Sequence, residues 1–257
     1  DSDTIVVGSP QESSNQTTIT NGTTASSNNS LGNCGAAYVF RRNGSTWSSE
    51  AYIKAPNAET GEFFGNSVSI SGDTILVGAF NEDSNQTSIT NGTTASSDNS
   101  TVNSGAAYVF RRNGSIWSSE AYLKAPNPDT GDIFGQKGIS ITGDTIVVGA
   151  SQEDSNQTTI TNGSTASSIN IPDTTNGNHG AVYVFKRYGT IWTNEAYLKA
   201  PNAEAGDNFG SSVSISVDTI VVGAPLEDSI QTTITNGTTN ATNGASNSGA
   251  VYVFRRQ

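Results

Sequence analysis

Short apolar segments separated by turn residues make up most of this chain. Residues 67–70, Ser-Val-Ser-Ile, alternate polar and apolar side chains, which indicates a half-buried strand. Thr74–Val77 is a continuous apolar run, as expected of a strand covered on both faces. Further strands are predicted at Gly105–Phe110 and Trp117–Lys124, with the hairpin signal Asn113-Gly114 between them. These four strands form one antiparallel unit, and no segment has the pattern of a long amphipathic helix.

The same unit returns along the whole chain at a period of about 70 residues. Two stretches show the repeat most clearly, Asp3–Gly8 and Tyr38–Phe40. Their copies are Asp73–Gly78, Asp144–Gly149 and Asp218–Gly223 for the first, and Tyr108–Phe110, Tyr183–Phe185 and Tyr252–Phe254 for the second. A fixed period of this length indicates an array of supersecondary units. We therefore predict an all-β fold, a β-propeller of four-stranded antiparallel blades.

One repeat domain is expected to occupy residues 1–257, with units at approximately 1–63, 64–133, 134–208 and 209–257. The first unit lacks its first strand and the last unit lacks its fourth, so both ends are incomplete blades. Three interpretations stand: a fragment of a longer array, a four-bladed ring with two reduced blades, or open edges filled by neighbouring chains in a head-to-tail fibre. The third agrees best with an acidic and highly repetitive chain.

Phe-Gly and Gly-Ala pairs recur at matching places in the units. They are Phe64-Gly65 with Gly78-Ala79, Phe134-Gly135 with Gly149-Ala150, and Phe209-Gly210 with Gly223-Ala224-Pro225. In this pattern the chain resembles the FG-GAP repeat family, which builds the β-propeller of integrin α chains and of many bacterial and algal surface proteins. The resemblance covers essentially the whole chain and implies an extracellular or cell-surface propeller. The family includes adhesion, scaffolding and enzyme-attached modules, so the resemblance does not single out a function.

Integrin-type repeats often carry an Asp-rich calcium loop between the first two strands. Here that link is a short turn such as Ser71-Gly72-Asp73, whose single carboxylate cannot supply the oxygens that calcium needs. Acidic residues gather instead at the start of each long loop and before each Phe-Gly pair. The candidate calcium ligands are Glu82, Asp83, Asp129, Asp132, Glu153, Asp154, Glu204, Asp207, Glu227 and Asp228. The alternative is that they cap backbone amides in tight turns, as Glu59 and Glu62 would in the preceding copy.

A long polar loop joins the second and third strands of every unit. It contains Thr-Ile-Thr-Asn-Gly-Thr-Thr in the first and fourth copies, with close relatives in the other two. The central Asn-Gly between β-prone arms predicts an extra β-hairpin on each blade. Such hairpins would project from one rim and suit self-assembly or sugar display. The alternative is a surface flap packed against its own blade.

Many Asn-X-Ser/Thr sequences lie in these predicted loops, where an oligosaccharide would not disturb the core. The candidate glycosylation sites are Asn15, Asn21, Asn28, Asn43, Asn85, Asn91, Asn99, Asn113, Asn156, Asn162, Asn236 and Asn240. A chain this rich in Asn, Ser and Thr contains several such sequences by chance, and the Thr/Ser-rich loops are also suited to O-glycans. We expect N-glycosylation of some of these residues if the protein is secreted.

Composition narrows the class of partner. Hydrophobic residues make up only 33% of the chain, but they gather in periodic runs, which favours a β protein with long polar loops over disorder. The net charge of −11 disfavours nucleic acid, which requires a basic surface, and allows cations such as calcium. No apolar run reaches the roughly 18 residues of a membrane span.

Catalytic residues are not expected. The single Cys34 and the single His179 fill the same position in two units, a loop position that is Ser in the other copies, Ser104 and Ser248. A nucleophile–base pair would need mutual reach and a third group, and no metal-ligand cluster stands out. The recurring Trp47, Trp117 and Trp192 are interpreted as packing between blades, with a sugar-binding groove as the alternative.

These observations predict an extracellular structural protein, a subunit of a glycosylated filament or matrix that self-assembles through blade and strand-edge contacts. The second hypothesis is an adhesion or ligand-binding propeller of a larger surface protein, assisted by calcium. In that case the ligand site is expected at the longest and most divergent loop, residues 169–178. An enzyme is the third and weakest hypothesis.

Overall fold

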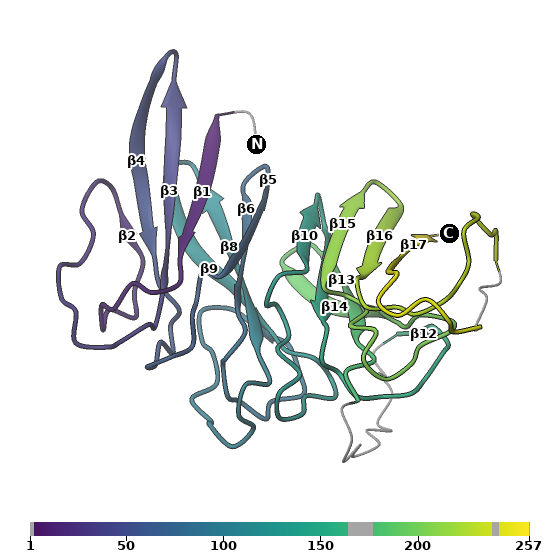
Figure 1. The fold of residues 1–257 in the computed structure, drawn as a ribbon. Coiled ribbons are helices and arrows are strands. Elements are labelled where there is room, and N and C mark those ends of the chain that lie inside the picture. Colours follow the sequence, from purple (N-terminus) through teal and green to yellow (C-terminus); the bar gives the residue numbers. More distant parts are fainter. Residues whose placement is uncertain (1–2, 164–176, 238–241, 257) are drawn as a thin grey trace.

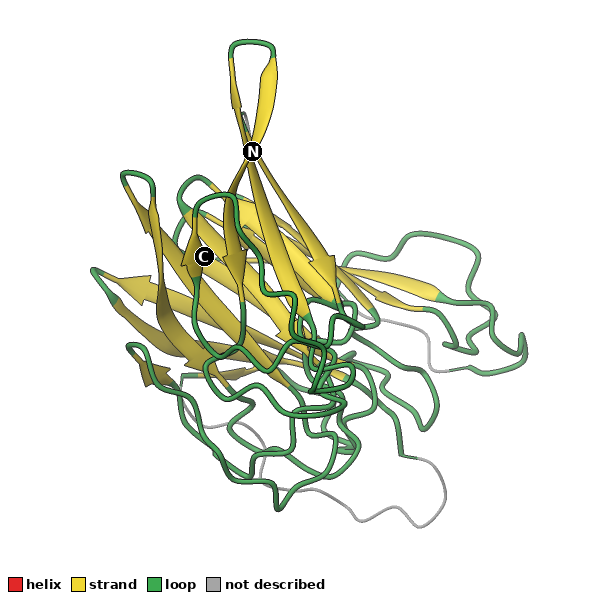
Figure 2. Ribbon diagram, turned by 90° about the vertical axis from the view of Figure 1, so that its left-hand side faces the viewer, coloured by secondary structure: helices red, strands yellow, loops and turns green. Residues whose placement is uncertain are grey.

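The computed structural model describes residues 3–163, 177–237 and 242–256, and these form strands, turns and loops without a helix (Figure 2). The strands assemble into four antiparallel sheets, here called blades 1 to 4. Blade 1 has the order β1 (Thr4–Ser9), β3 (Ala36–Asn43), β4 (Thr46–Ile53), β2 (Thr20–Asn21). Blade 2 has the order β5 (Ser67–Ser71), β6 (Thr74–Ala79), β8 (Ala106–Asn113), β9 (Ile116–Leu123), β7 (Thr90–Asn91).

Blade 3 repeats the arrangement of blade 2, and blade 4 is shorter. Blade 3 has the order β10 (Ile139–Thr142), β11 (Thr145–Ala150), β13 (Ala181–Tyr188), β14 (Ile191–Leu198), β12 (Thr161–Asn162). Blade 4 has the order β15 (Ser212–Ser216), β16 (Thr219–Ala224), β17 (Ala250–Arg255). The predicted all-β fold of four-stranded antiparallel units is confirmed, as are the incomplete blades at the two ends. The described residues include no helix with the length and apolar character of a membrane span.

The predicted extra hairpin is wrong at the Asn-Gly turns of blades 1 to 3, whereas in blade 4 Ser229 and Asn243 form an isolated antiparallel bridge and residues 238–241 lie outside the described residues. Thr90 and Asn91 pair instead with Tyr122 and Ala121 of β9, so the loop adds a two-residue fifth strand to the outer edge of its own blade. β2 and β12 do the same in blades 1 and 3. The physical reason is the free edge of the fourth strand, whose unpaired backbone groups accept the loop more readily than the loop pairs with itself. The flap interpretation therefore describes these loops better.

The four blades follow one another along an open arc, with blade 1 and blade 4 at its opposite ends (Figure 1). The first strands β5, β10 and β15 lie side by side along the inside of this arc, and β1 lies next to β5. The long loops gather at one end of the strands, at the bottom of Figure 1. In every blade the long loop joins the second and third strands of the unit, and these two strands pair with each other in the sheet.

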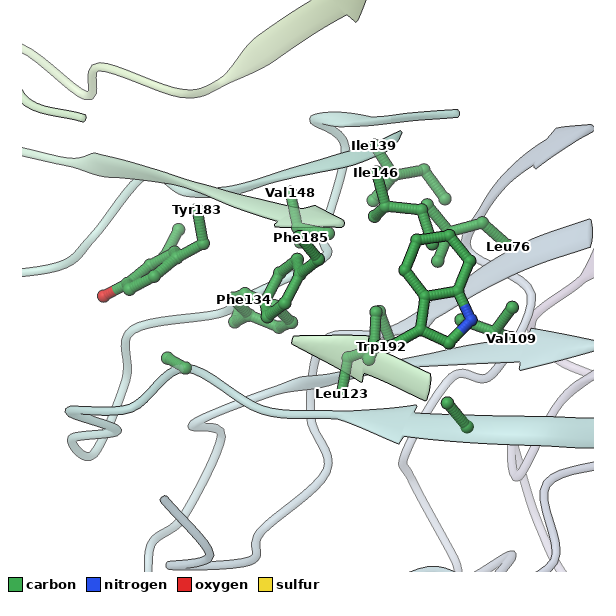
Figure 3. Close-up of a cluster of buried hydrophobic side chains, with 14 of the residues drawn as sticks. Leu76, Val109, Leu123, Phe134, Ile139, Ile146, Val148, Tyr183, Phe185 and Trp192 are labelled. Atoms are coloured by element: carbon green, nitrogen blue, oxygen red, sulfur yellow. The ribbon is translucent and has the colours of Figure 1, made fainter. Parts of the chain in front are cut away.

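The hydrophobic core lies between blades. Each of three clusters joins one face of a blade, its trailing face, to the opposite, leading face of the next blade. Between blades 2 and 3 the trailing face supplies Leu76, Val109 and Leu123, and the leading face supplies Phe185 and Trp192 (Figure 3). A lone blade would leave both apolar faces in water, so each blade depends on its neighbours.

The Phe-Gly motif places a buried ring at every blade junction. Phe64 is fully buried and meets the rings of Tyr108 and Phe110 edge-on, at centroid distances of 5.3 and 6.0 Å. Its backbone N–H donates to the carbonyl of Cys34 in blade 1, at 3.1 Å. The motif therefore joins the core of one blade to the backbone of the blade before it.

The glycine of the Gly-Ala pair is required by the close approach of two backbones. A Cβ at Gly78 would collide with the carbonyl oxygen of Gly135, and Gly8 and Gly149 stand in the same relation to Gly65 and Gly210. These glycines allow the Phe-Gly turn of the following unit to lie directly on the sheet. The spacing of the two motifs in the sequence thus reflects one contact between consecutive blades.

Gly78→Ala is expected to destabilise the protein by about 3 kcal/mol, because the added methyl group must displace the backbone of the neighbouring blade. Urea unfolding followed by tryptophan fluorescence would measure the loss. Gly32→Ala is the matched control, since nothing lies within 4 Å of a Cβ there. Equal stability of the two variants would contradict the close-approach explanation.

Candidate assembly interface

A charged contact between Arg, Glu and Trp is repeated between the blades. At the junction of blades 2 and 3, Nη1 of Arg187 donates to Oε1 of Glu120 at 3.0 Å, and Nε1 of Trp192 donates to the same oxygen at 3.1 Å. The guanidinium also lies over the ring of Trp192, 5.0 Å from its centroid. We call this set the Arg–Glu–Trp contact. It joins polar groups that would be costly to bury singly.

The junction of blades 1 and 2 contains the same contact, made by Arg112, Glu50 and Trp117. The Arg side chain also bonds within its own blade, where Asp73 accepts from Nε of Arg112 at 2.7 Å. Nη1 reaches back further to Thr4 Oγ1 in blade 1, at 3.2 Å. One guanidinium therefore fixes the position of a blade relative to its predecessor.

A β-bulge presents the glutamate of this contact. In blade 2, Val109 pairs with Ala121 and Phe110 with Ser119, which leaves Glu120 as the extra residue of β9. Glu50 and Glu195 are the extra residues of β4 and β14. A bulge re-aims a side chain that regular pleating would direct elsewhere. Here it turns a carboxylate toward the next blade.

The Asn of the loop motif makes a second recurring contact. Oδ1 of Asn21 accepts from the backbone N–H of Trp117 at 2.7 Å, and its Nδ2 donates to the carbonyl of Trp117 at 3.2 Å. Asn91 bonds in the same way to Trp192. The two-residue edge strands therefore hold the fourth strand of the following blade as well as their own.

The contact is incomplete between blades 3 and 4. Arg256 Nη2 meets Glu195 Oε1 at 2.7 Å, but no Trp is present in blade 4 to donate to this carboxylate. Among the described residues Glu195 Oε2 is buried without a hydrogen-bond partner. The Arg256 side chain is 23% exposed, against 6% for Arg187. At the other two junctions, the Trp in the fourth strand of the following blade completes the contact.

A buried lysine lies at the base of each complete blade. Nζ of Lys124 is fully buried and donates to Glu82 Oε2 at 2.9 Å, to Ser104 Oγ at 2.8 Å and to the carbonyl of Gly105 at 2.7 Å. Tyr122 Oη donates to the other carboxylate oxygen, Oε1, at 2.7 Å. Glu82 is thus satisfied by two donors of the fourth strand. In blade 3, Lys199 and Tyr197 donate hydrogen bonds to Glu153 in the same way.

These lysines explain the position shared by Cys34 and His179. In blade 1 the Lys54 ammonium donates to Cys34 Sγ at 3.0 Å, in the place that Ser104 Oγ takes in blade 2. His179 occupies this position in blade 3 and is also buried. The position lines the lysine site and is part of the core.

Several of the predicted calcium ligands accept hydrogen bonds from backbone N–H groups of turns. Asp83, Asp154 and Asp228 accept from the backbone N–H groups of Asn103, Asn178 and Asn247, all of which have positive φ. Asp132 and Asp207 accept from the N–H groups of Asp129 and Glu204, and Glu204 also bonds Asn243. Glu82 and Glu153 face lysines, and Glu227 bonds Asn202. In the part of the chain that is described, no three His, Cys, Asp or Glu side chains are grouped to hold a metal, and calcium binding stays a prediction.

Burial raises the pKa of the carboxylates before the Phe-Gly pairs. The pKa of Glu62 is raised to about 8, mainly by desolvation and further by the charges of Glu82, Glu59 and Asp83, although the N–H of Glu59 opposes the shift. Desolvation likewise raises the pKa of Asp132 well above its usual value and that of Asp207 to about 6. A bound divalent cation would lower these pKa values.

The candidate glycosylation sites separate into two groups. All that lie in the described residues are exposed, but the amides of Asn21 and Asn91 are engaged by the next blade. The Nδ2 group of Asn99 donates to Glu59. Asn15, Asn28, Asn43, Asn85, Asn113, Asn156, Asn162 and Asn236 lie exposed on loops, hairpin ends or the end of β12, and Asn240 lies outside the described residues. Glycosylation of all these residues stays a prediction.

Large apolar side chains are exposed at the two ends of the array. Ile5 and Val7 on the leading face of blade 1 are 44% and 46% exposed, and Trp47 is 43% exposed, whereas Trp117 in blade 2 is 1% exposed. On the trailing face of blade 4, Val251 and Val253 are 70% and 67% exposed. Their counterparts in inner blades are buried. The end faces are therefore the chain's candidate interaction surface.

Sequence reasoning missed the Arg–Glu–Trp contact and the buried lysine. The signal was present, because Lys follows Trp by seven residues in every fourth strand, as in Trp117 and Lys124. A lysine at the end of an apolar strand before Ala-Pro is more often interpreted as a solvated strand end. The Arg residues of the contact come directly before the strand-end turns, yet the side chains of Arg112 and Arg187 are largely buried.

Glu120→Ala is expected to destabilise the protein by about 3–5 kcal/mol, because it leaves the buried Arg187 guanidinium and Trp192 Nε1 without their acceptor. Glu195→Ala is the matched control and should cost about 1 kcal/mol or less, since Arg256 is partly solvated and no Trp depends on it. Urea unfolding midpoints would compare the two. Equal losses would contradict a special role for the complete contact.

The raised pKa of Glu62 predicts that stability falls as pH rises from about 4.5 to about 8, because over this window the native state holds a proton that the unfolded state releases. Glu62→Gln keeps an oxygen for the Glu59 N–H and removes the buried charge. The variant should melt several degrees higher than the parent at pH 8. The two melting curves should converge near pH 4.5, and a constant difference across the range would show that the carboxyl does not titrate as described.

The comparisons with known proteins agree with this geometry. The FG-GAP repeat family matches residues 47–110, 117–165 and 192–254, which together cover more than half of the chain. No curated protein matches the chain. Each matched segment includes a Phe-Gly turn, a Gly-Ala strand end or both, the two parts of the blade junction. The chain belongs to the FG-GAP repeat family.

Proposed function

We propose that this chain is an extracellular structural subunit that assembles end to end with other copies of itself. The trailing face of blade 4 in one copy packs on the leading face of blade 1 in the next. The observation that carries the proposal is that both faces are buried at the junctions inside the chain and exposed at its ends. FG-GAP repeats are typical of extracellular and cell-surface proteins, which supports the location.

The internal junctions supply the template for this contact. Ile75 and Val77, the counterparts of Ile5 and Val7, pack with Val39 and Ala37 of the preceding blade. Val253 in blade 4 is the counterpart of Val39, and Val251 is the counterpart of Ala37. The two end faces thus carry the same kinds of side chain that already pack together within the molecule.

A contact between two different faces is heterologous, and repetition of it produces a fibre unless the rotation closes a ring. The acidic surface keeps single copies apart in solution until the apolar faces meet. Exposed candidate glycosylation sites such as Asn28 and Asn156 belong to the long loops, which gather at one end of the strands (Figure 1). A filament or matrix protein therefore agrees with both the shape and the surface.

The alternative, an adhesion or ligand-binding propeller, has less support. Its expected site was the divergent loop at residues 169–178, and residues 169–176 of that loop lie outside the described residues. The blades that are described use equivalent positions for equivalent structural contacts. A role without catalysis stays a prediction of the sequence.

Ile5→Asp and Val253→Asp should each reduce end-to-end association, because each places a carboxylate on one apolar end face. Light scattering coupled to size-exclusion chromatography, with negative-stain electron microscopy, would follow the assembly. Ile116→Asp is the matched control, as this exposed residue lies in an inner blade.

Mixing the two end variants tests the direction of the contact. Ile5→Asp keeps a normal trailing face and Val253→Asp keeps a normal leading face, so the mixture should form dimers that neither variant forms alone. A parent chain that stays monomeric at high concentration, or variants that associate like the parent, would overturn the proposal.

A further inference from the structure

Among the described residues no strand pairs with the outer edge of β17, whereas blades 1 to 3 each have a fourth strand at this place. In blades 1 to 3 the third strand pairs with a second strand on one side and a fourth strand on the other. Within the described residues β17 pairs with β16 alone. Its outer edge therefore presents backbone N–H and C=O groups for a further strand.

Beside this edge lies a buried carboxylate with one unused oxygen. Glu227 is 2% exposed, and its Oε1 accepts from Asn202 Nδ2 at 2.9 Å, but Oε2 has no hydrogen-bond partner in the part of the chain that is described. In blades 2 and 3 the same oxygen, Oε2 of Glu82 and Glu153, accepts from a buried lysine. The missing donor is thus the lysine of a fourth strand.

A second carboxylate identifies another residue of the same strand. Glu195 Oε2 is also buried without a partner among the described residues. Its counterparts Glu50 and Glu120 accept from Nε1 of the Trp in the following blade. Asn162, at the end of β12, has the place from which Asn21 and Asn91 bond the backbone of that Trp. The missing strand would supply the Trp.

The spacing of these donors defines one segment. In all three fourth strands of the chain, Tyr follows Trp by five residues and Lys follows Trp by seven, as in Trp117, Tyr122 and Lys124. Trp meets the carboxylate of the preceding blade, whereas Tyr and Lys meet the carboxylate of their own blade. One strand with this spacing would therefore satisfy Glu195 and Glu227 together.

We propose that the edge of β17 is a binding site for an antiparallel β-strand that carries Trp, Tyr and Lys at the spacing of β9. Backbone pairing with β17 supplies affinity, and the two buried carboxylates select the side chains. This deepens the proposed assembly by specifying the strand that the open edge accepts. It concerns the edge of blade 4 and does not require stacking of the apolar end faces.

A synthetic peptide with the sequence of residues 114–126 provides the test. Fluorescence anisotropy of the labelled peptide would measure its binding to the full chain with Ile5→Asp, which removes end-to-end stacking at the far blade. The peptide should bind, and Trp117→Ala or Lys124→Met in the peptide should each weaken binding at least tenfold. A peptide of the same composition in scrambled order is the control.

A double-mutant cycle assigns the lysine contact. Glu227→Gln in the chain should remove most of the difference between the parent peptide and its Lys124→Met form, because the charge that selects the lysine is gone. No binding, equal binding of the scrambled peptide, or an unchanged lysine effect in the Glu227→Gln chain would overturn the proposal. Peptide binding by a chain that fails to associate end to end would preserve this inference and reject the stacking proposal alone.

Discussion

The structure depends on burial of one face of each sheet against the opposite face of the next. A four-stranded blade has apolar residues on both faces, and each fully buried aliphatic side chain contributes about 1.5–3 kcal/mol only when a neighbouring blade covers it. The stability of the array is therefore a property of its junctions. The sequence repeat, the Phe-Gly and Gly-Ala motifs and the exposed ends all follow from this constraint. The motifs exist because two backbones approach too closely there for a side chain.

Polar contacts give these junctions their specificity. The apolar faces alone would tolerate sliding of one blade over another, whereas the Arg–Glu–Trp contact has a fixed geometry of charge, hydrogen bond and ring. Arg187 bonds Glu120 of the preceding blade and Asp144 of its own blade, so it fixes the relative position of both. The bulge that presents the glutamate recurs at the same place in β4, β9 and β14. Conversely, a missing strand leaves a recognisable set of unsatisfied groups.

An internal cation contacts two of the candidate calcium ligands, since Lys124 faces Glu82 and Lys199 faces Glu153. In blades 1 and 2 a lysine ammonium lies among a carboxylate, a backbone carbonyl and the residue of the variable loop position. Calcium and ammonium both require oxygen ligands, so the acidic loop composition by itself is compatible with either. The lysine is covalently part of the fourth strand and fixes the long loop to it. The loop conformation therefore depends on pairing of the fourth strand.

The sequence determined the repeat, the strands, their antiparallel order and the incomplete ends, because alternation and turn residues act locally and each is present several times. It also indicated aromatic packing between blades, because Trp and Tyr each recur at a fixed position in every fourth strand. Only the tertiary structure decided the contacts between blades, such as Asn21 with Trp117 across 96 residues and Glu120 with Arg187. It also decided that the Asn-Gly loop of blade 2 pairs with its own blade instead of forming a hairpin. These outcomes depend on which edges and faces remain free after the sheets have formed, and a local pattern does not contain that information.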